Sequence, residues 1–286
     1  MTIALVIKVA DGVVIAADSA TTLAQQSVDG PAVVENIYNN ANKVFNLHKG
    51  LPVGALTWGL GNIGPSSISS LSKDLRRRFQ GGSASHAGWK LKEDTYDVEG
   101  VANRAREFLF EERYATEHGN EPQPPSLHLG YLIAGYSADE DEPSVYVLDL
   151  GDGVSAPTPV FPDGETGAAW WGQPEAISRI MNGLSMDAVG ALMNMGNDAA
   201  TSQAAAADLL AQLRRQLVSP AMPIQDAIDL AVFLVEATIQ FVRFSPGSPM
   251  VGGPVDVATI TKHEGFRWVQ RKHFFETRLN PKEEIR

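Results

Sequence analysis

Runs of apolar residues with strand-like spacing open the chain. Residues 3–9 and 13–17 are rich in β-branched side chains, and an Asp-Gly pair between them accepts the positive φ angles of a tight turn. This pattern predicts an antiparallel hairpin at the start of the sequence. Residues 43–47 and 53–58 repeat the pattern around turn residues at 48–50, so they predict a second hairpin.

Helical periodicity follows these hairpins. Residues 68–79 place apolar side chains three or four positions apart and end at a Gly-Gly pair, and residues 98–118 do the same before Gly119. Both segments are therefore predicted helices. A stretch rich in Gly, Pro and Ser at 151–167 predicts a long connection. The remaining predicted helices are 175–181, 199–218 and 224–244, and the remaining predicted strands are 127–136, 144–150, 255–261 and 266–271.

The order of these elements indicates the fold class. Strand hairpins, helices, strands, helices and strands follow one another, which suits two antiparallel sheets packed face to face with helices outside. The chain has 286 residues, of which 44% are hydrophobic, and its apolar segments are evenly spread without an internal repeat. We therefore predict a single α+β domain over residues 1–286, built as a four-layer αββα sandwich.

Charge and composition narrow the range of functions. With 23 Lys and Arg against 34 Asp and Glu, the net charge is −11, which argues against nucleic acid or an anionic membrane as a partner. The absence of cysteine excludes disulfides, thiolate metal sites and a cysteine nucleophile. The six histidines form no H-E-x-x-H motif or i, i+4 pair, so neither a metal site nor a cofactor is expected. Because no signal peptide or membrane-length apolar segment occurs, a cytoplasmic protein is predicted.

The first part of the chain resembles a known family. Four residues around the two hairpins occur in the order found in proteasome β-type subunits: Thr2, Asp18, Lys43 and Gly59. The resemblance covers residues 2–65 and returns at 251–260, with the sequence VGGPVDVATI. On these residues the chain is similar to a divergent bacterial-type member of the proteasome β-type family, within the N-terminal nucleophile hydrolases. The resemblance implies the αββα fold of that superfamily.

There is also a chemical reason, independent of the resemblance, for Thr2 to act as a nucleophile. A hydroxyl is a weak nucleophile near neutral pH and needs a base within hydrogen-bond reach. An α-amine titrates near about pH 8, so an N-terminal threonine carries the nucleophile and the base in one residue. Removal of Met1 would give Thr2 this amine, and a strand that starts at the next residue would hold it in a sheet.

The resemblance assigns supporting roles to the other three residues. Lys43 would lower the pKa of the Thr2 amine and hydroxyl, and Asp18 would keep Lys43 charged and oriented. The N–H of Gly59 would face the developing oxyanion, a contact whose loss typically raises the barrier by about 3–4 kcal/mol. The expected activity is that of a threonine peptidase or amidohydrolase, which acts on a peptide or protein through an acyl-enzyme. The family also implies a homo-oligomer, plausibly a ring, whereas no unfoldase partner can be assigned.

Several departures from the family leave an alternative open. A supporting Ser is replaced by Trp171 or Gln173, and a supporting Asp by Arg243 or Phe244, while Ser248 could stand in for a second Ser. These changes permit a catalytically inactive protein that keeps the fold for assembly or binding. An acyl-enzyme resolved by an amine would instead make the protein a peptide ligase or transpeptidase.

One further segment has no obvious counterpart in the family. Residues at about 182–222 form a predicted helical insertion, interpreted as decoration or as a lid or partner surface. A polar tail begins at about residue 273.

A rival motif lies at residues 59–64. The sequence GLGNIG fits the G-x-G-x-x-G fingerprint of dinucleotide sites and lies between a strand and a helix. The fingerprint also requires a parallel second strand that ends in an acidic residue about 20 positions later. Here that region reads LRRRFQGG, so dinucleotide binding is the less favoured interpretation.

Overall fold

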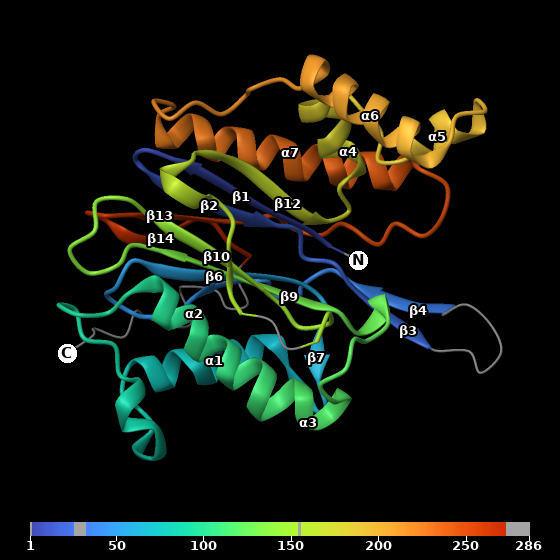
Figure 1. Cartoon of the computed structure of the whole chain (residues 1–286). Coiled ribbons are helices and arrows are strands. Elements are labelled where there is room, and N and C mark those ends of the chain that lie inside the picture. Colours follow the sequence, from blue (N-terminus) through green and yellow to red (C-terminus); the bar gives the residue numbers. More distant parts are fainter. Residues whose placement is uncertain (1, 26–32, 154–155, 273–286) are drawn as a thin grey trace.

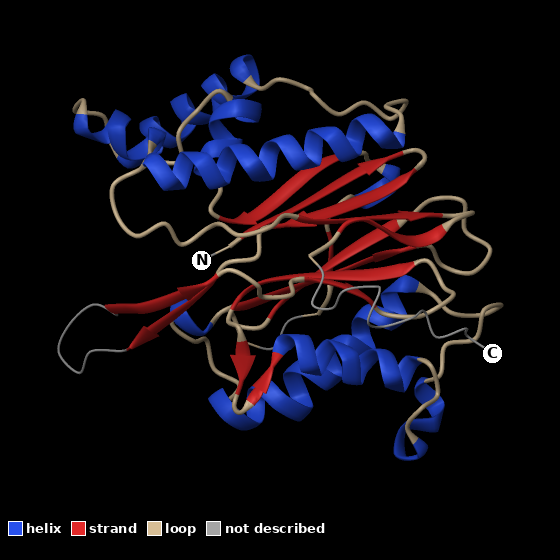
Figure 2. Ribbon diagram, turned by 180° about the vertical axis from the view of Figure 1, so that it is seen from behind, coloured by secondary structure: helices blue, strands red, loops and turns tan. Residues whose placement is uncertain are grey.

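Two antiparallel sheets of five strands each lie face to face, and helices cover their outer faces (Figures 1 and 2). This arrangement is that of a computed structural model, which describes residues 2–25, 33–153 and 156–272. The layers follow one another as helices, sheet, sheet and helices. The predicted α+β class with antiparallel sheets is therefore confirmed.

The first sheet joins the first two strands of the chain to the last two. Its strand order is β12-β1-β2-β13-β14, and each neighbouring pair is antiparallel. The turn between its first two strands needs glycine at position 12, because a Cβ atom there would lie 2.6 Å from the carbonyl oxygen of Ile260. The strands are β1 (Ile3–Val9), β2 (Gly12–Ala17), β12 (Gly167–Gly172), β13 (Asp256–Thr261) and β14 (Gly265–Gln270).

The second sheet is built from the middle of the chain. Its strand order is β11-β10-β9-β6-β5, again antiparallel throughout. Its strands are β5 (Val44–Asn46), β6 (Val53–Gly59), β9 (Leu129–Gly135), β10 (Ser144–Asp149) and β11 (Thr158–Pro159). Two small hairpins lie outside the large sheets, and the first of them projects from the body of the molecule (Figure 1). They are β3 (Thr21–Gln25) with β4 (Val33–Tyr38), and β7 (Asn62–Ile63) with β8 (Ser66–Ser67).

Two groups of helices form the outer layers (Figure 1). The group on the second sheet contains α1 (Ile68–Phe79), the short 3₁₀ segment at Ala84–Trp89, and a continuous helix made of α2 (Val98–Arg106), a π-helical segment (Glu107–Tyr114) and α3 (Ala115–His118). The group on the first sheet contains α4 (Glu175–Ile177), a π-helical turn (Ser178–Asn182), α5 (Ala188–Asn194), α6 (Ala199–Leu213) and α7 (Ile224–Phe244). Short 3₁₀ turns at Pro125–Leu127 and Pro162–Gly164 complete the described helical segments.

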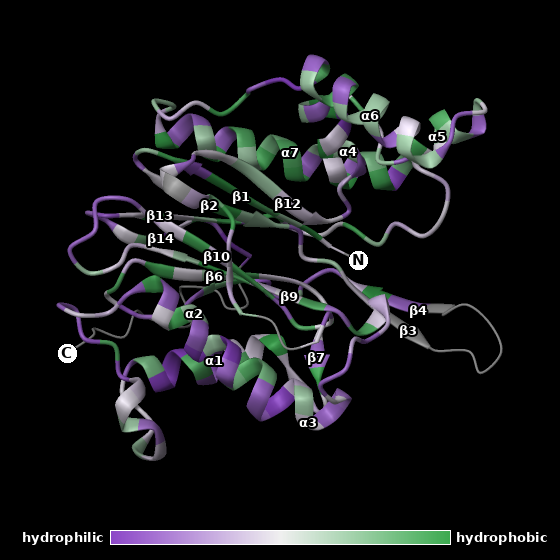
Figure 3. Cartoon of the chain, in the orientation of Figure 1, coloured by the Kyte–Doolittle hydropathy of each residue, from purple (hydrophilic) through white to green (hydrophobic). Residues whose placement is uncertain are grey.

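Strand β1 shows why residues 3–7 are apolar without interruption. Ile3, Leu5 and Ile7 belong to the core under α7, whereas Ala4 and Val6 belong to the core between the two sheets. Successive side chains of a strand point to opposite faces, so a strand buried on both faces needs apolar residues at every position. In Figure 3 strands β1 and β2 are accordingly coloured as hydrophobic over much of their length.

The structure differs from the predicted elements in several places. The predicted helix 175–181 is divided between α4 and a π-helical turn, and the predicted helix 199–218 ends at Leu213, because Arg214 leaves the helical conformation and the N–H of Arg215 bonds to the carbonyl of Met181. Strands β11 and β12 and the β3–β4 and β7–β8 hairpins were not predicted, and β11 lies in the segment predicted as a long connection. Helix α5 was not predicted as a separate element, although it lies within the helical insertion predicted at about 182–222. The polar tail from residue 273 lies outside the described residues. None of the helices among the described residues is long and apolar enough to cross a membrane.

Candidate active site

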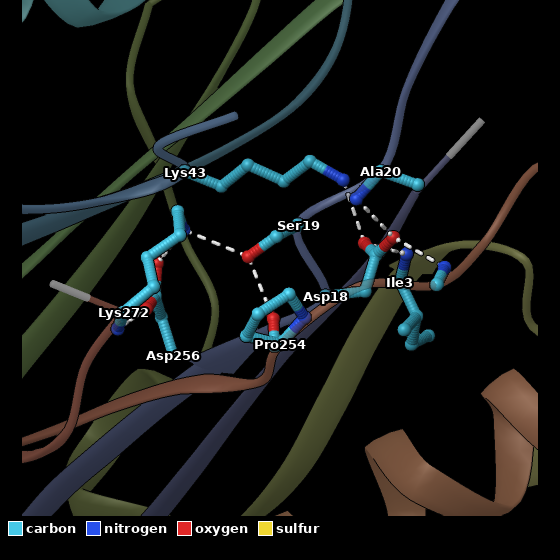
Figure 4. A network of polar contacts seen from close by, with 9 residues as sticks. Ile3, Asp18, Ser19, Ala20, Lys43, Pro254, Asp256 and Lys272 are labelled. Atoms are coloured by element: carbon cyan, nitrogen blue, oxygen red, sulfur yellow. Dashed lines mark hydrogen bonds and ion pairs between the residues drawn. The ribbon is translucent and has the colours of Figure 1, made fainter. Parts of the chain in front are cut away.

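The sheet pairing brings Asp18 and Lys43 together and holds the backbone next to Thr2 against Asp18 (Figure 4). Thr2 precedes β1 and Asp18 follows β2, and these strand ends lie side by side because Ala4 pairs with Ala17. Lys43 precedes β5 in the other sheet, and its side chain reaches across to the carboxylate of Asp18. The candidate site therefore lies between the two sheets, where the start of β1, the end of β2 and the start of β5 come together.

The carboxylate of Asp18 is the centre of this network. It is fully buried and accepts four hydrogen bonds. Oδ1 accepts from the ammonium of Lys43 at 2.6 Å and from the backbone N–H of Ile3 at 3.0 Å. Oδ2 accepts from the backbone N–H groups of Ala20 and Gly252, each at 3.0 Å. These four donors satisfy the hydrogen-bonding capacity of a carboxylate that is shielded from solvent.

The ammonium of Lys43 is buried as well, and its surroundings act on it in opposite directions. Burial lowers the pKa of Lys43, and the nearby charge of Lys272 lowers it further. The charge and hydrogen bond of Asp18 raise it again without cancelling the effect of burial. The pKa of Lys43 therefore lies below its usual value, so this lysine releases its proton more readily than an exposed one.

The backbone on both sides of Thr2 is held in the sheet. The carbonyl of Thr2 accepts a hydrogen bond of 2.8 Å from the N–H of Gln173, and the N–H of Ile3 donates to Asp18. Gly172 allows the close approach of β12, because a Cβ atom there would lie 1.9 Å from the Thr2 carbonyl oxygen. Thr2 itself is buried. Met1 lies outside the described residues.

Gly59 is linked to this place only indirectly. Its φ of +84° ends β6, and a Cβ atom there would lie 2.3 Å from the carbonyl oxygen of His128. The ring of the preceding Trp58 stacks on Trp171, with 4.6 Å between ring centroids, and Trp171 pairs with Ala4 in the first sheet. Trp58, the neighbour of Gly59, thus contacts β12, the strand that pairs with the start of β1. Gly59 itself shares no hydrogen bond with the Asp18 network in the part of the chain that the structure describes.

A second buried ion pair lies beside the first and was missed by the sequence analysis (Figure 4). The ammonium of Lys272 pairs with the carboxylate of Asp256 and donates to the hydroxyl of Ser19 at 2.7 Å. Ser19 in turn donates to the carbonyl of Pro254 at 2.6 Å. Asp256 is a charged residue at the start of an apolar, buried strand. Because a buried aspartate is rarely found without a partner, this position in the sequence is a signal for an ion pair. Lys272 lies between the last predicted strand, which ends at residue 271, and the polar tail predicted from about residue 273, so no pattern in the sequence marks it.

The residues that depart from the family lie in different places. The backbone of Gln173 bonds to Thr2, as described above. Arg243 and Phe244 are exposed at the end of α7, where their side chains contact each other, and Ser248 is exposed in the following loop. None of these three belongs to the described Asp18 network. The later part of the chain contributes the N–H of Gly252 instead.

The segment 59–64 does not have the surroundings of a dinucleotide site. Strand β6 is flanked by antiparallel β5 and β9, and the segment continues into the β7–β8 hairpin before α1 begins. A dinucleotide fingerprint needs a strand, a helix and a parallel strand in succession. This geometry does not favour cofactor binding there.

Comparisons with known proteins add no family assignment: no protein-family model and no curated protein matches the chain. The argument for function therefore rests on the residues and geometry of the site.

Proposed function

We propose that this protein is a threonine peptidase or amidohydrolase of the N-terminal nucleophile type, with Thr2 as the nucleophile. One observation carries the proposal. One oxygen of the buried Asp18 carboxylate accepts two hydrogen bonds. One comes from the N–H of Ile3, the residue after Thr2, and the other comes from the ammonium of Lys43. A nucleophile, an acid group and a positive charge near the start of a strand are the parts that such a mechanism requires.

The layered architecture supports the same proposal. Two antiparallel sheets between helix layers, with the candidate site at a shared end, agree with the αββα fold of N-terminal nucleophile hydrolases. The proposed family is that of proteasome β-type subunits. On this proposal the substrate is a peptide or protein, and the working form is a homo-oligomer that could be a ring.

The proposed reaction begins after the chain is cut in front of Thr2. The freed amine accepts the proton of the Thr2 hydroxyl as Oγ forms a bond to the carbonyl carbon of the substrate amide. The N–H of Gly59 would stabilise the oxyanion. The C–N bond then breaks, the proton passes to the leaving amine, and an acyl-Thr2 ester remains. Water, deprotonated by the same amine, releases the acid and restores Thr2. An incoming amine in place of water would give transpeptidation.

A second candidate is a non-catalytic protein that uses this fold for assembly or binding. The positions of Arg243, Phe244 and Ser248 favour it, because these residues are exposed and away from Asp18. On this alternative, these three positions do not supply the Ser and Asp residues that support the Thr2 amine in the family.

Active-site labelling tests the proposal. Intact-mass measurement first establishes whether residue 2 is the N-terminus of the purified protein. An epoxyketone or β-lactone should then add one inhibitor mass to the wild-type protein, and peptide mapping should place it on Thr2. The Thr2→Ala variant should remain unlabelled, whereas Thr2→Ser should retain labelling. A processed protein that shows no labelling, or equal labelling of Thr2→Ala, would overturn the assignment in favour of the non-catalytic candidate.

A further inference from the structure

Three metal-ligating side chains meet at the end of the second sheet, away from the Asp18 network. His128 precedes β9, Asp149 is the last residue of β10, and Asp152 lies in the following turn. Because β9 and β10 are antiparallel, with Asp149 paired to Gly130, the start of one strand lies beside the end of the other. One ligand atom from each of the three side chains lies within 4.8 Å of the others. Motif searching could not find this group, since its members come from two separate segments.

The imidazole ring of His128 is fixed by groups outside the cluster. Its Nε2 lies 2.8 Å from the carbonyl oxygen of Gln123. A carbonyl only accepts hydrogen bonds, so Nε2 carries the proton and, in the neutral ring, Nδ1 presents a lone pair. Metal-binding histidines commonly donate their other ring N–H to a carbonyl or carboxylate in this way, which fixes the orientation of the ring.

The loop around the ring is shaped to hold it. The N–H of Gln123 donates to the carbonyl of Gly151 at 2.8 Å, which ties the loop before His128 to the turn after β10. A Cβ atom on Gly151 would lie 2.3 Å from the His128 ring, so only glycine leaves room for the ring there. The position of the imidazole is therefore built into both segments.

The gap between His128 and Asp149 leaves room for a cation. Nδ1 of His128 lies 3.9 Å from Oδ1 of Asp149, beyond the roughly 3.2 Å limit of a good N–H···O hydrogen bond. Bonds of about 2.0–2.2 Å from an intervening metal ion to imidazole nitrogen and carboxylate oxygen would bridge this gap after a small side-chain rotation. Oδ1 of Asp152 lies 3.7 Å from the protonated Nε2, so the Asp152 side chain has to rotate toward Nδ1 to bind the same ion.

We propose that His128, Asp149 and Asp152 bind one divalent transition-metal ion, with Zn²⁺ preferred and Mn²⁺ as the alternative. One imidazole nitrogen and two carboxylate oxygens form a donor set that suits these ions, and their two negative charges balance a divalent cation. The exposed side of the site leaves further positions to water. Binding does not depend on the proposed peptidase activity.

A bound ion would also stiffen the turn that carries Gly59. The carbonyl of His128 accepts the N–H of Leu60 at 2.9 Å and lies against Gly59, where no Cβ atom fits. An ion that fixes His128 thus fixes the backbone at the end of β6.

Equilibrium dialysis with metal analysis tests the site on the full chain after chelation and removal of the chelator. Wild-type protein is expected to bind one Zn²⁺ per chain. His128→Ala and Asp149→Asn should each weaken binding by at least about tenfold. His263→Ala, which removes an exposed histidine elsewhere, should leave it unchanged.

Asp152→Asn keeps the experiment decisive if the other variants fail to fold, because its side chain is 69% exposed. Circular dichroism without metal establishes that each variant is folded. Lower affinity in folded Asp152→Asn, together with a Zn²⁺-dependent rise in the Tm of the wild type, supports the site. Wild-type affinity weaker than about 100 µM, or equal affinity in folded Asp152→Asn, would overturn it.

Discussion

The ammonium of Lys272 lies 2.7 Å from the hydroxyl of Ser19 and forms an ion pair with the buried carboxylate of Asp256. Ser19 follows Asp18, whose carboxylate lies 2.6 Å from the ammonium of Lys43. Two buried ion pairs therefore lie side by side, because Asp18 and Ser19 are neighbours in the chain. Removal of one partner from such a pair leaves an uncompensated charge in a buried position, which is costlier than removal of both.

We expect Asp256→Asn or Lys272→Met alone to lower the free energy of unfolding by about 3–5 kcal/mol. The double variant should lose clearly less than the sum of the two, because no isolated charge remains. Urea unfolding of all four proteins gives the coupling energy directly. The exposed pair of Lys262 and Asp141 is a matched control, in which both single changes should have little effect. Strictly additive losses at Asp256 and Lys272 would contradict the ion-pair interpretation.

Gly172 controls the position of Thr2. A Cβ atom at residue 172 would lie 1.9 Å from the Thr2 carbonyl oxygen, and φ there is +96°. Because the clash is with backbone, a side-chain rotation cannot relieve it. Gly172→Ala should lower the free energy of unfolding by at least about 1–3 kcal/mol and abolish the labelling of Thr2.

Gly190 provides the control for this substitution. It lies in α5 with nothing within 4 Å of an added Cβ atom. Gly190→Ala should therefore leave labelling intact and stabilise the protein by about 0.5–1 kcal/mol, since alanine favours helix. Unchanged labelling in Gly172→Ala would argue that the carbonyl of Thr2 does not need its observed position.

The parts of the fold that the sequence predicted well are those with strong local signals. The runs 3–9 and 13–17 are rich in β-branched residues and flank a turn that only glycine fits, and they form β1 and β2 as expected. Helix α1 has apolar residues at 68, 71, 75 and 79, all of them buried, and its observed bounds equal the predicted ones. Thr2, Asp18 and Lys43 were located by resemblance; the structure pairs Asp18 with Lys43 and binds Asp18 to the backbone N–H of Ile3, and the catalytic role of Thr2 stays a prediction.

The parts that were missed depend on contacts between distant segments. Lys272 is 253 positions from Ser19, so no local pattern connects them. Asp149 and Asp152 look like exposed acidic turn residues until β9 places His128 beside them. Helix α5 contains Gly190 and Asn194 and has no buried residue, so it lacks the apolar stripe by which a helix is recognised.

The stack of Trp58 on Trp171 joins the two sheets close to Gly59. Trp58 occupies space that glycine at position 130 leaves open, because a Cβ atom there would lie 1.9 Å from the indole ring. Gly130→Ala should therefore displace the indole and slow the labelling of Thr2, as should Trp58→Ala. Quantitative labelling rates and tryptophan fluorescence measure both effects. If the Trp58–Trp171 stack is lost and the labelling rate of either variant is still unchanged, the stack does not position Gly59.

The side chains of Arg78 and Glu112 bind the helices over the second sheet to each other. Two parallel hydrogen bonds of 2.7 and 2.8 Å join the guanidinium to the carboxylate, and the guanidinium also lies over the ring of Phe108, 4.2 Å from its centroid. The hydrogen bonds from Arg78 and its charge lower the pKa of Glu112 from the usual value of 4.5. Arg78 itself is almost completely buried, whereas about a third of the Glu112 side chain is exposed, at 32%.

This pKa shift predicts how the pair depends on pH. A carboxyl group with a lower pKa in the folded state adds stability above its unfolded value, and the contribution disappears as the pH falls through the folded value. Glu112→Gln should thus be less stable than wild type at neutral pH, by no more than about 1 kcal/mol because solvent screens the exposed side of the pair. The difference should shrink as the pH falls below 4.5 and vanish below the lowered pKa of Glu112. Urea unfolding of both proteins across this range measures it. A difference that stays constant with pH would contradict the charge-based interpretation, since glutamine keeps the shape of the side chain and loses its charge.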